Sequence, residues 1–250
     1  MKNLRQDSAR TRKSLLTTAS EVFAEKGYHN TTIAEISERA GTNIAAVNYH
    51  FGDKETLYRK AWRYAFLQSL ESHPPHGGAP DTAPVEQRLK AHIRALLSRI
   101  TDSGNRGFMI VYKELSNPTG LLEEVMREEV LPITERMEGL VREVLGPGVS
   151  KTKVRFYAIA IIGQCVMPTF INRLEKLESD VQKDSWRIED IDAYARHVAA
   201  FSLAGMRAVR RAVEEHAAGD KSPRKESGQL RSTTGRSKVS ASSARERRFT

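Results

Sequence analysis

Residues 31–51 place a short helical pattern on each side of one glycine, and this arrangement constrains the fold more than any other part of the chain. Thr32 and Glu35 have the spacing of a capping box, which predicts that a helix begins there and that both side chains return to the backbone. Gly41 follows where a helix ends with a positive φ, and Asn43 can cap a second helix. Two short helices joined by such a turn are typical of a helix-turn-helix, whose second helix enters the DNA major groove.

The second of these helices is expected to have one apolar face and one small, polar face. Ile44, Val47 and Phe51 have the i, i+3, i+7 spacing of side chains turned toward a core. The opposite side carries alanines and hydrogen-bonding side chains where a solvated helix usually carries Glu and Lys, which favours contact with DNA. The candidate DNA-binding residues are Thr31, Thr32, Thr42, Asn43, Ala45, Ala46, Asn48, Tyr49, His50 and Lys54.

Basic side chains flank this pattern on both sides in the sequence. Lys54 follows the candidate cap Asp53 at a helix start, where the macrodipole disfavours a cation, so a bound phosphate would give this charge a partner. Arg10, Arg12 and Lys13 crowd the first turns of an earlier helix. They can rest on a DNA backbone, or they can simply face water, as clusters of charge usually do.

Apolar residues recur at helical spacing through most of the chain, and no strand-like alternation competes with them. The predicted fold is therefore all-α, with about nine helices, of which the first is expected from Ser8 after a flexible arm over residues 1–7. Four prolines and two glycines between residues 72 and 84 mark a boundary. The expected units are a DNA-binding domain with its connecting helix, a linker, a helical domain and a disordered basic tail, over residues 1–72, 73–84, 85–217 and 218–250.

Two helical patterns near the C-terminal end carry more apolar surface than one protomer can bury. Residues 156–170 are apolar on more than one face, and the last helix adds small residues that allow close approach. Such a surplus suits a self-complementary interface, so we expect a homodimer built on a four-helix bundle. The candidate interface residues are Phe156, Ile159, Tyr194, Val198, Phe201, Gly205 and Ala208.

The composition argues against several other classes of protein. The chain has one cysteine, Cys165, so no intrachain disulfide or multi-cysteine metal site can form. No phosphate-binding loop, metal-ligand spacing or nucleophile with a recognisable partner occurs, which predicts no enzymatic activity, no metal and no cofactor. A polar N-terminus and the lack of eighteen consecutive apolar residues predict a cytoplasmic protein that does not bind membranes.

The positive charge is concentrated at the C-terminal end. Residues 218–250 contain nine Lys or Arg and three acidic residues, which is +6 of the formal net charge of +9. This tail can hold DNA without regard to sequence through counterion release, or it can be a solubilising segment. A non-specific or architectural DNA-binding protein is therefore the alternative to a sequence-specific one.

Residues 10–60 also contain a specific set of matching positions, namely Ala19, Phe23, Gly27, Thr31, Thr32, Ile33, Ile36, Ala40, Gly41, His50, Phe51, Lys54, Glu55 and Leu57. With these residues the stretch resembles the DNA-binding domain of the TetR/AcrR family of bacterial transcriptional regulators. Residues 43–55, and residues 113–120 less closely, resemble the CecR-type subset of that family. The family's usual Tyr-x-His-Phe is replaced here by Asn48-Tyr49-His50-Phe51, and its frequent glycine by Ala45.

The resemblance implies a fourth helix that connects the first domain to a helical domain, which dimerises and often holds a small-molecule inducer. The implied function is a ligand-responsive repressor that binds a palindromic operator in double-stranded DNA as a homodimer. A small hydrophobic or aromatic effector is expected, although aromatic and methionine side chains at helical spacing also form ordinary cores. The candidate pocket residues are Phe66, Phe108, Tyr112, Met126, Tyr157, Gln164, Met167 and Phe170.

Overall fold

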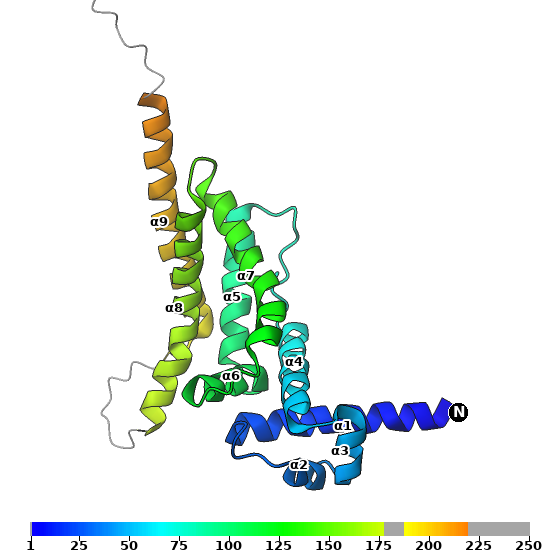
Figure 1. The fold of residues 1–250 in the computed structure, drawn as a ribbon. Coiled ribbons are helices and arrows are strands. Elements are labelled where there is room, and N and C mark those ends of the chain that lie inside the picture. The colour runs from blue at the N-terminus through cyan, green and yellow to red at the C-terminus, as the bar shows by residue number, and fades with distance from the viewer. Residues whose placement is uncertain (1, 178–187, 220–250) are drawn as a thin grey trace, which may run out of the picture.

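The computed structural model describes residues 2–177 and 188–219, and within these ranges the chain forms nine α-helices and no strand (Figure 1). The prediction of an all-α fold is therefore confirmed. Nearly all of the basic tail predicted over 218–250 lies outside the described residues. The helices are α1 Lys2–Lys26, α2 Ile33–Arg39, α3 Ile44–Phe51, α4 Lys54–Ser72, α5 Val85–Thr101, α6 Arg106–Ser116, α7 Glu123–Leu145, α8 Lys151–Leu177 and α9 Ile191–Gly219.

Helix α1 begins at Lys2, well before the expected start at Ser8. The prediction of a flexible arm is therefore wrong for residues 2–7. These residues include neither proline nor glycine, and Lys, Leu, Arg and Gln are good helix formers. The apolar stripe on which the prediction relied begins only at Leu15, so it contained no information about the turns that precede it.

The first four helices share one hydrophobic core. The rings of Phe23 and Tyr58 meet edge to face at its centre, with 4.8 Å between their centroids. Helices α2 and α3 add Ile36, Val47 and Phe51 to this core. Because isolated helices of seven or eight residues are unstable in water, α2 and α3 depend on this packing against α1 and α4.

A second hydrophobic core lies between α5, α7, α8 and α9. Helix α5 is central, since it contacts each of the other three and buries Leu89, Ile93 and Leu97 completely. Figure 1 shows α8 and α9 on one side of α5 and α7, and α4 on the other side. The helical pattern that follows the Pro- and Gly-rich segment thus forms a bundle with its own interior.

Helix α6 joins the two cores. Its Ile110 is buried among residues of α1 and α4, whereas Phe108 packs against the second core. The hydroxyl of Tyr58 on α4 donates to Oε2 of Glu114 on α6 at 2.9 Å. Residues 73–84 contain no helix, as a linker requires, but α6 and the start of α7 pack on the N-terminal helices. The division of the chain into domains at this segment stays a prediction.

Candidate DNA-binding surface and ligand cavity

The start of α2 is held by one half of the expected capping box. Oγ1 of Thr32 accepts a hydrogen bond from the backbone N–H of Glu35 at 3.1 Å. The carboxylate of Glu35 does not return to the cap, because it pairs with Lys26 at 2.5 Å and with Arg39 at 2.8 Å. The hydrogen bond from Lys26 holds the pKa of Glu35 below its ordinary value. The predicted reciprocal bond is therefore replaced by ion pairs that connect α2 to α1.

The turn between α2 and α3 is fixed by local bonds. Gly41 has a φ of 64°, and the N–H of Thr42 donates to the carbonyl of Ser37 at 2.9 Å. A Schellman motif has two hydrogen bonds that close a helix end at a residue with positive φ, and this bond is the one that spans more residues. Oδ1 of Asn43 then accepts from the N–H of Ala46 at 2.9 Å and caps α3. The helix-turn-helix predicted over 31–51 is present, with the cap residues that were expected.

The buried face of α3 differs from the predicted one. Val47 and Phe51 are buried as expected, but Ile44 is half-exposed and Ala46 packs partly against the core. Successive side chains of a helix are about 100° apart, so Ile44 shares the face of Val47 and Phe51, but it is the first residue of α3 and stands at the end of that face, 49% exposed. The assignment of Ile44 to the core is therefore wrong, and Ala46, which was expected outside, is partly covered by the core. Ile44 joins the exposed surface.

The exposed side of α3 carries Ala45, Asn48 and Tyr49, and the Tyr49 residue is 81% exposed. Thr32 and Asn43 are also exposed, while Thr42 and His50 are partly exposed around them. Thr31 is not on this surface: it is fully buried, and its hydroxyl donates to the carbonyl of Gly27 at 2.7 Å. Thr31 therefore has a structural role in place of the predicted contact with DNA, because its side chain closes the turn after α1.

Cationic side chains from α1 and α4 lie beside α3. The guanidinium carbon of Arg12 is 5.6 Å from the centroid of the Phe51 ring, and Nζ of Lys60 is 5.9 Å from the same centroid. Nζ of Lys54 lies 4.2 Å from the Tyr28 ring centroid, and partial burial lowers its pKa. Within the described part of the chain, none of these three cations forms an ion pair. Their charges are available to phosphates, and Lys60 is an addition to the residues that the sequence indicated.

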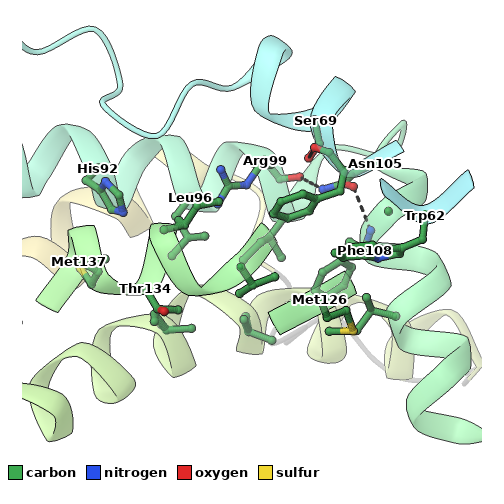
Figure 2. A pocket seen from close by; sticks show the side chains of 18 residues that line it. Trp62, Ser69, His92, Leu96, Arg99, Asn105, Phe108, Met126, Thr134 and Met137 are labelled. Carbon is green, nitrogen blue, oxygen red and sulfur yellow. Dashed lines mark hydrogen bonds between the residues drawn. The ribbon is translucent and has the colours of Figure 1, made fainter. Parts of the chain in front are cut away.

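A cavity of about 200 Å³ lies where α4, α5, α6, α7 and α8 meet (Figure 2). Three of the candidate pocket residues, Phe66, Phe108 and Met126, line it. Helix α8 contributes only Ile162 and Val166, which are one turn apart on a single face. The candidates that do not line this cavity are Tyr112, Tyr157, Gln164, Met167 and Phe170.

Most of the cavity wall is apolar, but two basic side chains of α5 reach it. His92 and Arg99 are only 2% and 6% exposed, and the atoms His92 Nδ1 and Arg99 Nη1 have no hydrogen-bond partner among residues 2–177 and 188–219. Burial, reinforced by the nearby charges of Arg99 and Arg136, lowers the pKa of His92 to about 4. Burial also lowers the pKa of Arg99, yet a guanidinium stays charged in proteins. At neutral pH the cavity thus contains a neutral imidazole and a buried positive charge.

The sequence analysis missed these two residues, although a signal was present. His92 and Arg99 occupy positions on the same helical face as Leu89, Leu96 and Ile100, all of which are buried. A charged residue within such a stripe must find a partner, because burying an unpaired charge is costly. Searching the predicted apolar faces for charged residues would therefore have found Arg99.

Large apolar side chains remain exposed on α8 and α9. Phe156 and Ile159 of α8 are 64% and 59% exposed, and Phe201 of α9 is 66% exposed. These three residues, hereafter the apolar patch, are among the candidate interface residues, as is the exposed Ala208. The patch lies on the two helices that form one side of the bundle in Figure 1.

Other candidate interface residues make contacts within one protomer. Val198 is completely buried, so its assignment to a subunit interface is wrong. The hydroxyl of Tyr194 donates to the backbone carbonyl of Gln164 at 3.2 Å, and Gly205 lies against the Tyr157 ring. The reason is that one face of α9 packs on α5 and α8, and these side chains belong to that face.

The apolar composition of α8 also resembles that of a membrane-spanning helix. In the described part of the chain, Lys151–Asn172 is the one segment that is long and apolar enough to cross a membrane. This property follows from length and composition only, and the core helix of a soluble protein shares it. The apolar patch is part of the reason, because Phe156 and Ile159 lie within this segment.

Known proteins resemble both halves of the chain. Residues 15–61 match the family model of bacterial regulatory proteins of the tetR family, and residues 85–206 match the C-terminal domain of the HTH-type transcriptional dual regulator CecR. The chain is 29% identical over 164 residues to CecR of Shigella flexneri, which covers 61% of this chain and 73% of that protein. It is 34% identical over 154 residues to the HTH-type transcriptional repressor BepR of Brucella suis, which covers 62% of this chain and 70% of that protein.

Solved structures share the arrangement of helices. The structure of AibR in complex with isovaleryl coenzyme A and operator DNA has a TM-score of 0.57 at 18% identity, and the match covers 76% of this chain and 97% of that chain. FadR from Bacillus subtilis in complex with stearoyl-CoA has a TM-score of 0.58 at 18% identity, and the match covers 77% and 98% of the two chains. These likenesses concern the fold.

Proposed function

The chain belongs to the TetR family of bacterial transcriptional regulators, and we propose that it is a ligand-responsive repressor that binds a palindromic operator as a homodimer. The observation that carries this proposal is the exposed side of α3, which is small and polar and lies near Arg12 and Lys60, two cations that form no ion pair with any other described residue. The relatives are transcriptional regulators, so we propose no enzymatic activity. A regulator of bacterial genes works where the DNA is, so we propose a cytoplasmic location for this protein.

In this proposal α3 lies in the major groove of the operator. Ala45 lets the helix backbone approach the bases, and the amide of Asn48 can form two hydrogen bonds with an adenine. The exposed Tyr49 reaches the phosphate backbone, where Arg12 and Lys60, both near the Phe51 ring, neutralise charge. Ile44 can contact a thymine methyl from the edge of the same surface.

The apolar patch supports a homodimer. In an isologous interface, Phe156, Ile159 and Phe201 of one protomer would be covered by the same helices of its partner. This arrangement also accounts for a helix as apolar as α8 in a protein that works on DNA. It sets two copies of α3 on one side of the dimer, where half-sites one turn apart require about 34–36 Å between recognition helices.

The cavity supports regulation by a small molecule, because its wall includes α4. Trp62 and Phe66 line the cavity, and α4 begins at Lys54, immediately after the recognition helix. A ligand that fits better when α4 is displaced shifts the population toward that state, and it thereby changes the distance between the two copies of α3. AibR, which shares this fold, holds a coenzyme A ester and operator DNA in one complex.

Selection of bound sequences from a random DNA pool tests the repressor proposal. We expect a palindromic motif whose half-sites are one helical turn apart. Asn48→Ala should weaken binding to that motif by about 30- to 25,000-fold, because one bidentate contact contributes about 1–3 kcal/mol and a dimer on a palindrome makes this contact twice. Gln68→Ala, an exposed change on α4, should leave the affinity unchanged.

The alternative of a non-specific DNA-binding protein gives a different outcome. It predicts that no motif is enriched, that bulk DNA competes as well as any selected fragment, and that the affinity falls steeply with salt. If the full-length protein enriches no motif from the pool at moderate salt, the repressor proposal is refuted.

A further inference from the structure

We propose that the cavity binds a small amphipathic carboxylate, with its acid group on Arg99 and its apolar part against α4, α7 and α8. The inference rests on the proposed function, since it names the chemical class of the effector. The sequence led us to expect a hydrophobic or aromatic effector. This inference adds that the effector has a negative charge and says which residue binds that charge.

The first argument is that the protein leaves the charge of Arg99 uncompensated. Among the residues that the structure describes, no carboxylate pairs with this guanidinium, and its Nη1 atom has no hydrogen bond. Isolated buried charges are costly, and they occur where a paired group or a ligand repays the cost. A guanidinium presents a planar fork of N–H donors that matches the two oxygens of a carboxylate.

The second argument is that the neutral polar side chains of the cavity are already used elsewhere. Oγ of Ser69 donates to the carbonyl of Phe66 at 2.6 Å, and Oγ1 of Thr134 donates to the carbonyl of Leu131 at 2.8 Å. The amide of Asn105 donates to the backbone carbonyl of Arg99 at 2.8 Å, so it holds the helix end and not the guanidinium. Among the described residues none of these side chains accepts a hydrogen bond from Nη1 of Arg99, which leaves this donor available to the oxygen atoms of a bound molecule.

The third argument is the position of Arg99 within the cavity. Figure 2 shows it between His92 at one end and Trp62 at the other, and two turns of α5 separate it from His92. Nε1 of Trp62 is a second buried donor that has no partner in the part of the chain that the structure describes, so a further polar atom of the ligand can be bound at that end. Between these groups the wall is apolar, with Phe108, Met126 and Ile162 available to the rest of the ligand.

The volume limits the size of the ligand. An apolar cavity of about 150 Å³ holds one benzene molecule, so a cavity of about 200 Å³ suits roughly ten non-hydrogen atoms. Phenylacetate and octanoate are of this size. The acyl end of a coenzyme A ester has no free carboxylate for Arg99.

Isothermal titration calorimetry of the full-length protein tests the inference. The panel contains straight-chain carboxylates of four to ten carbons, benzoate and phenylacetate, each compared with its primary amide, which has the same shape but no charge. We expect the best carboxylate to bind at least tenfold more tightly than its amide. Arg99→Met should bring this ratio to within about twofold. Arg94→Met, an exposed change on α5, should keep the wild-type ratio.

The variants are chosen so that a folding defect does not decide the result. Replacing a buried, unpaired charge by an apolar side chain of similar length is often neutral or stabilising, and the thermal midpoint of Arg99→Met checks this. Arg99→Lys keeps the charge and loses the fork, so it should retain part of the preference for the acid.

Three results would overturn the inference: no carboxylate of the panel binds, acid and amide bind the wild type equally, or the preference persists in Arg99→Met. Binding to the selected DNA motif is measured on the same samples. Specific DNA binding without carboxylate binding refutes only the inference about Arg99, whereas a lack of specific DNA binding refutes the repressor.

Discussion

Replacing Phe201 by Asp should separate the proposed homodimer into monomers. Phe201 is the most exposed member of the apolar patch on α8 and α9, so the change removes apolar area that only a partner subunit could cover. It also places one carboxylate from each protomer in the interface. The protomer should fold normally, because two-thirds of this side chain lies outside its core.

The magnitude follows from the exposed fraction. Fully burying a phenylalanine side chain contributes about 1.5–3 kcal/mol, so covering the 66% of Phe201 that is exposed contributes about 1–2 kcal/mol. A two-fold interface contains this side chain twice, which gives about 2–4 kcal/mol and a dimer that is about 30- to 700-fold weaker. Desolvation of the new carboxylates adds to this figure, so the range is a lower bound.

Sedimentation velocity of the full-length chain at micromolar concentration measures the effect. The wild type should sediment as a dimer and Phe201→Asp as a monomer, with the same thermal midpoint for the protomer fold. Leu67→Asp is the matched control, because Leu67 is an exposed apolar residue on α4, on the other side of the bundle. An undiminished dimer mass for Phe201→Asp, or a monomeric wild type, would show that the patch has another purpose.

Two further predictions concern stability. Between pH 6.5 and 4 the unfolded chain protonates His92 while the folded protein does not, so stability should fall toward acid by at most about 3 kcal/mol and rise toward neutral pH. Urea titrations at pH 4.5 and 7 should show that His92→Leu loses this part of the pH dependence, and identical pH dependence in both proteins would contradict the assigned burial. Tyr58→Phe removes the only hydrogen bond that the structure describes between this hydroxyl and Glu114, which should cost about 1.5–3 kcal/mol in urea unfolding. An unchanged midpoint would mean that the contact between α4 and α6 does not depend on that bond.

The helix-turn-helix is the part of the fold that local chemistry determines. Thr32 and Asn43 cap the two helices, and Gly41 takes the positive φ that ends the first. Each of these features acts over three to five residues, so the sequence contains the information that sets where the two helices begin and end, while packing against α1 and α4 stabilises them. Helix α1 shows the limit of this approach, since its first turns at Lys2 carry no apolar stripe to indicate them.

The faces of helices were less predictable, because several residues compete for each core. Ile44 and Ala46 exchanged their expected places since the buried side of α3 is set by α1 and α4. Val198 and Phe201 lie three residues apart on α9, yet one is fully buried and the other is mostly exposed. Periodicity identified both as apolar and could not say which of them faces α5.

The sequence by itself determined the all-α fold, the recognition helix and its caps, because these depend on neighbours along the chain. Only the tertiary structure decided which apolar side chains line a cavity, and that Arg99 lines it with an Nη1 atom that no other described residue bonds. The lining of that cavity comes from five helices spread over more than one hundred residues. Their relative placement results from the packing of whole helices, which no spacing within a single helix records.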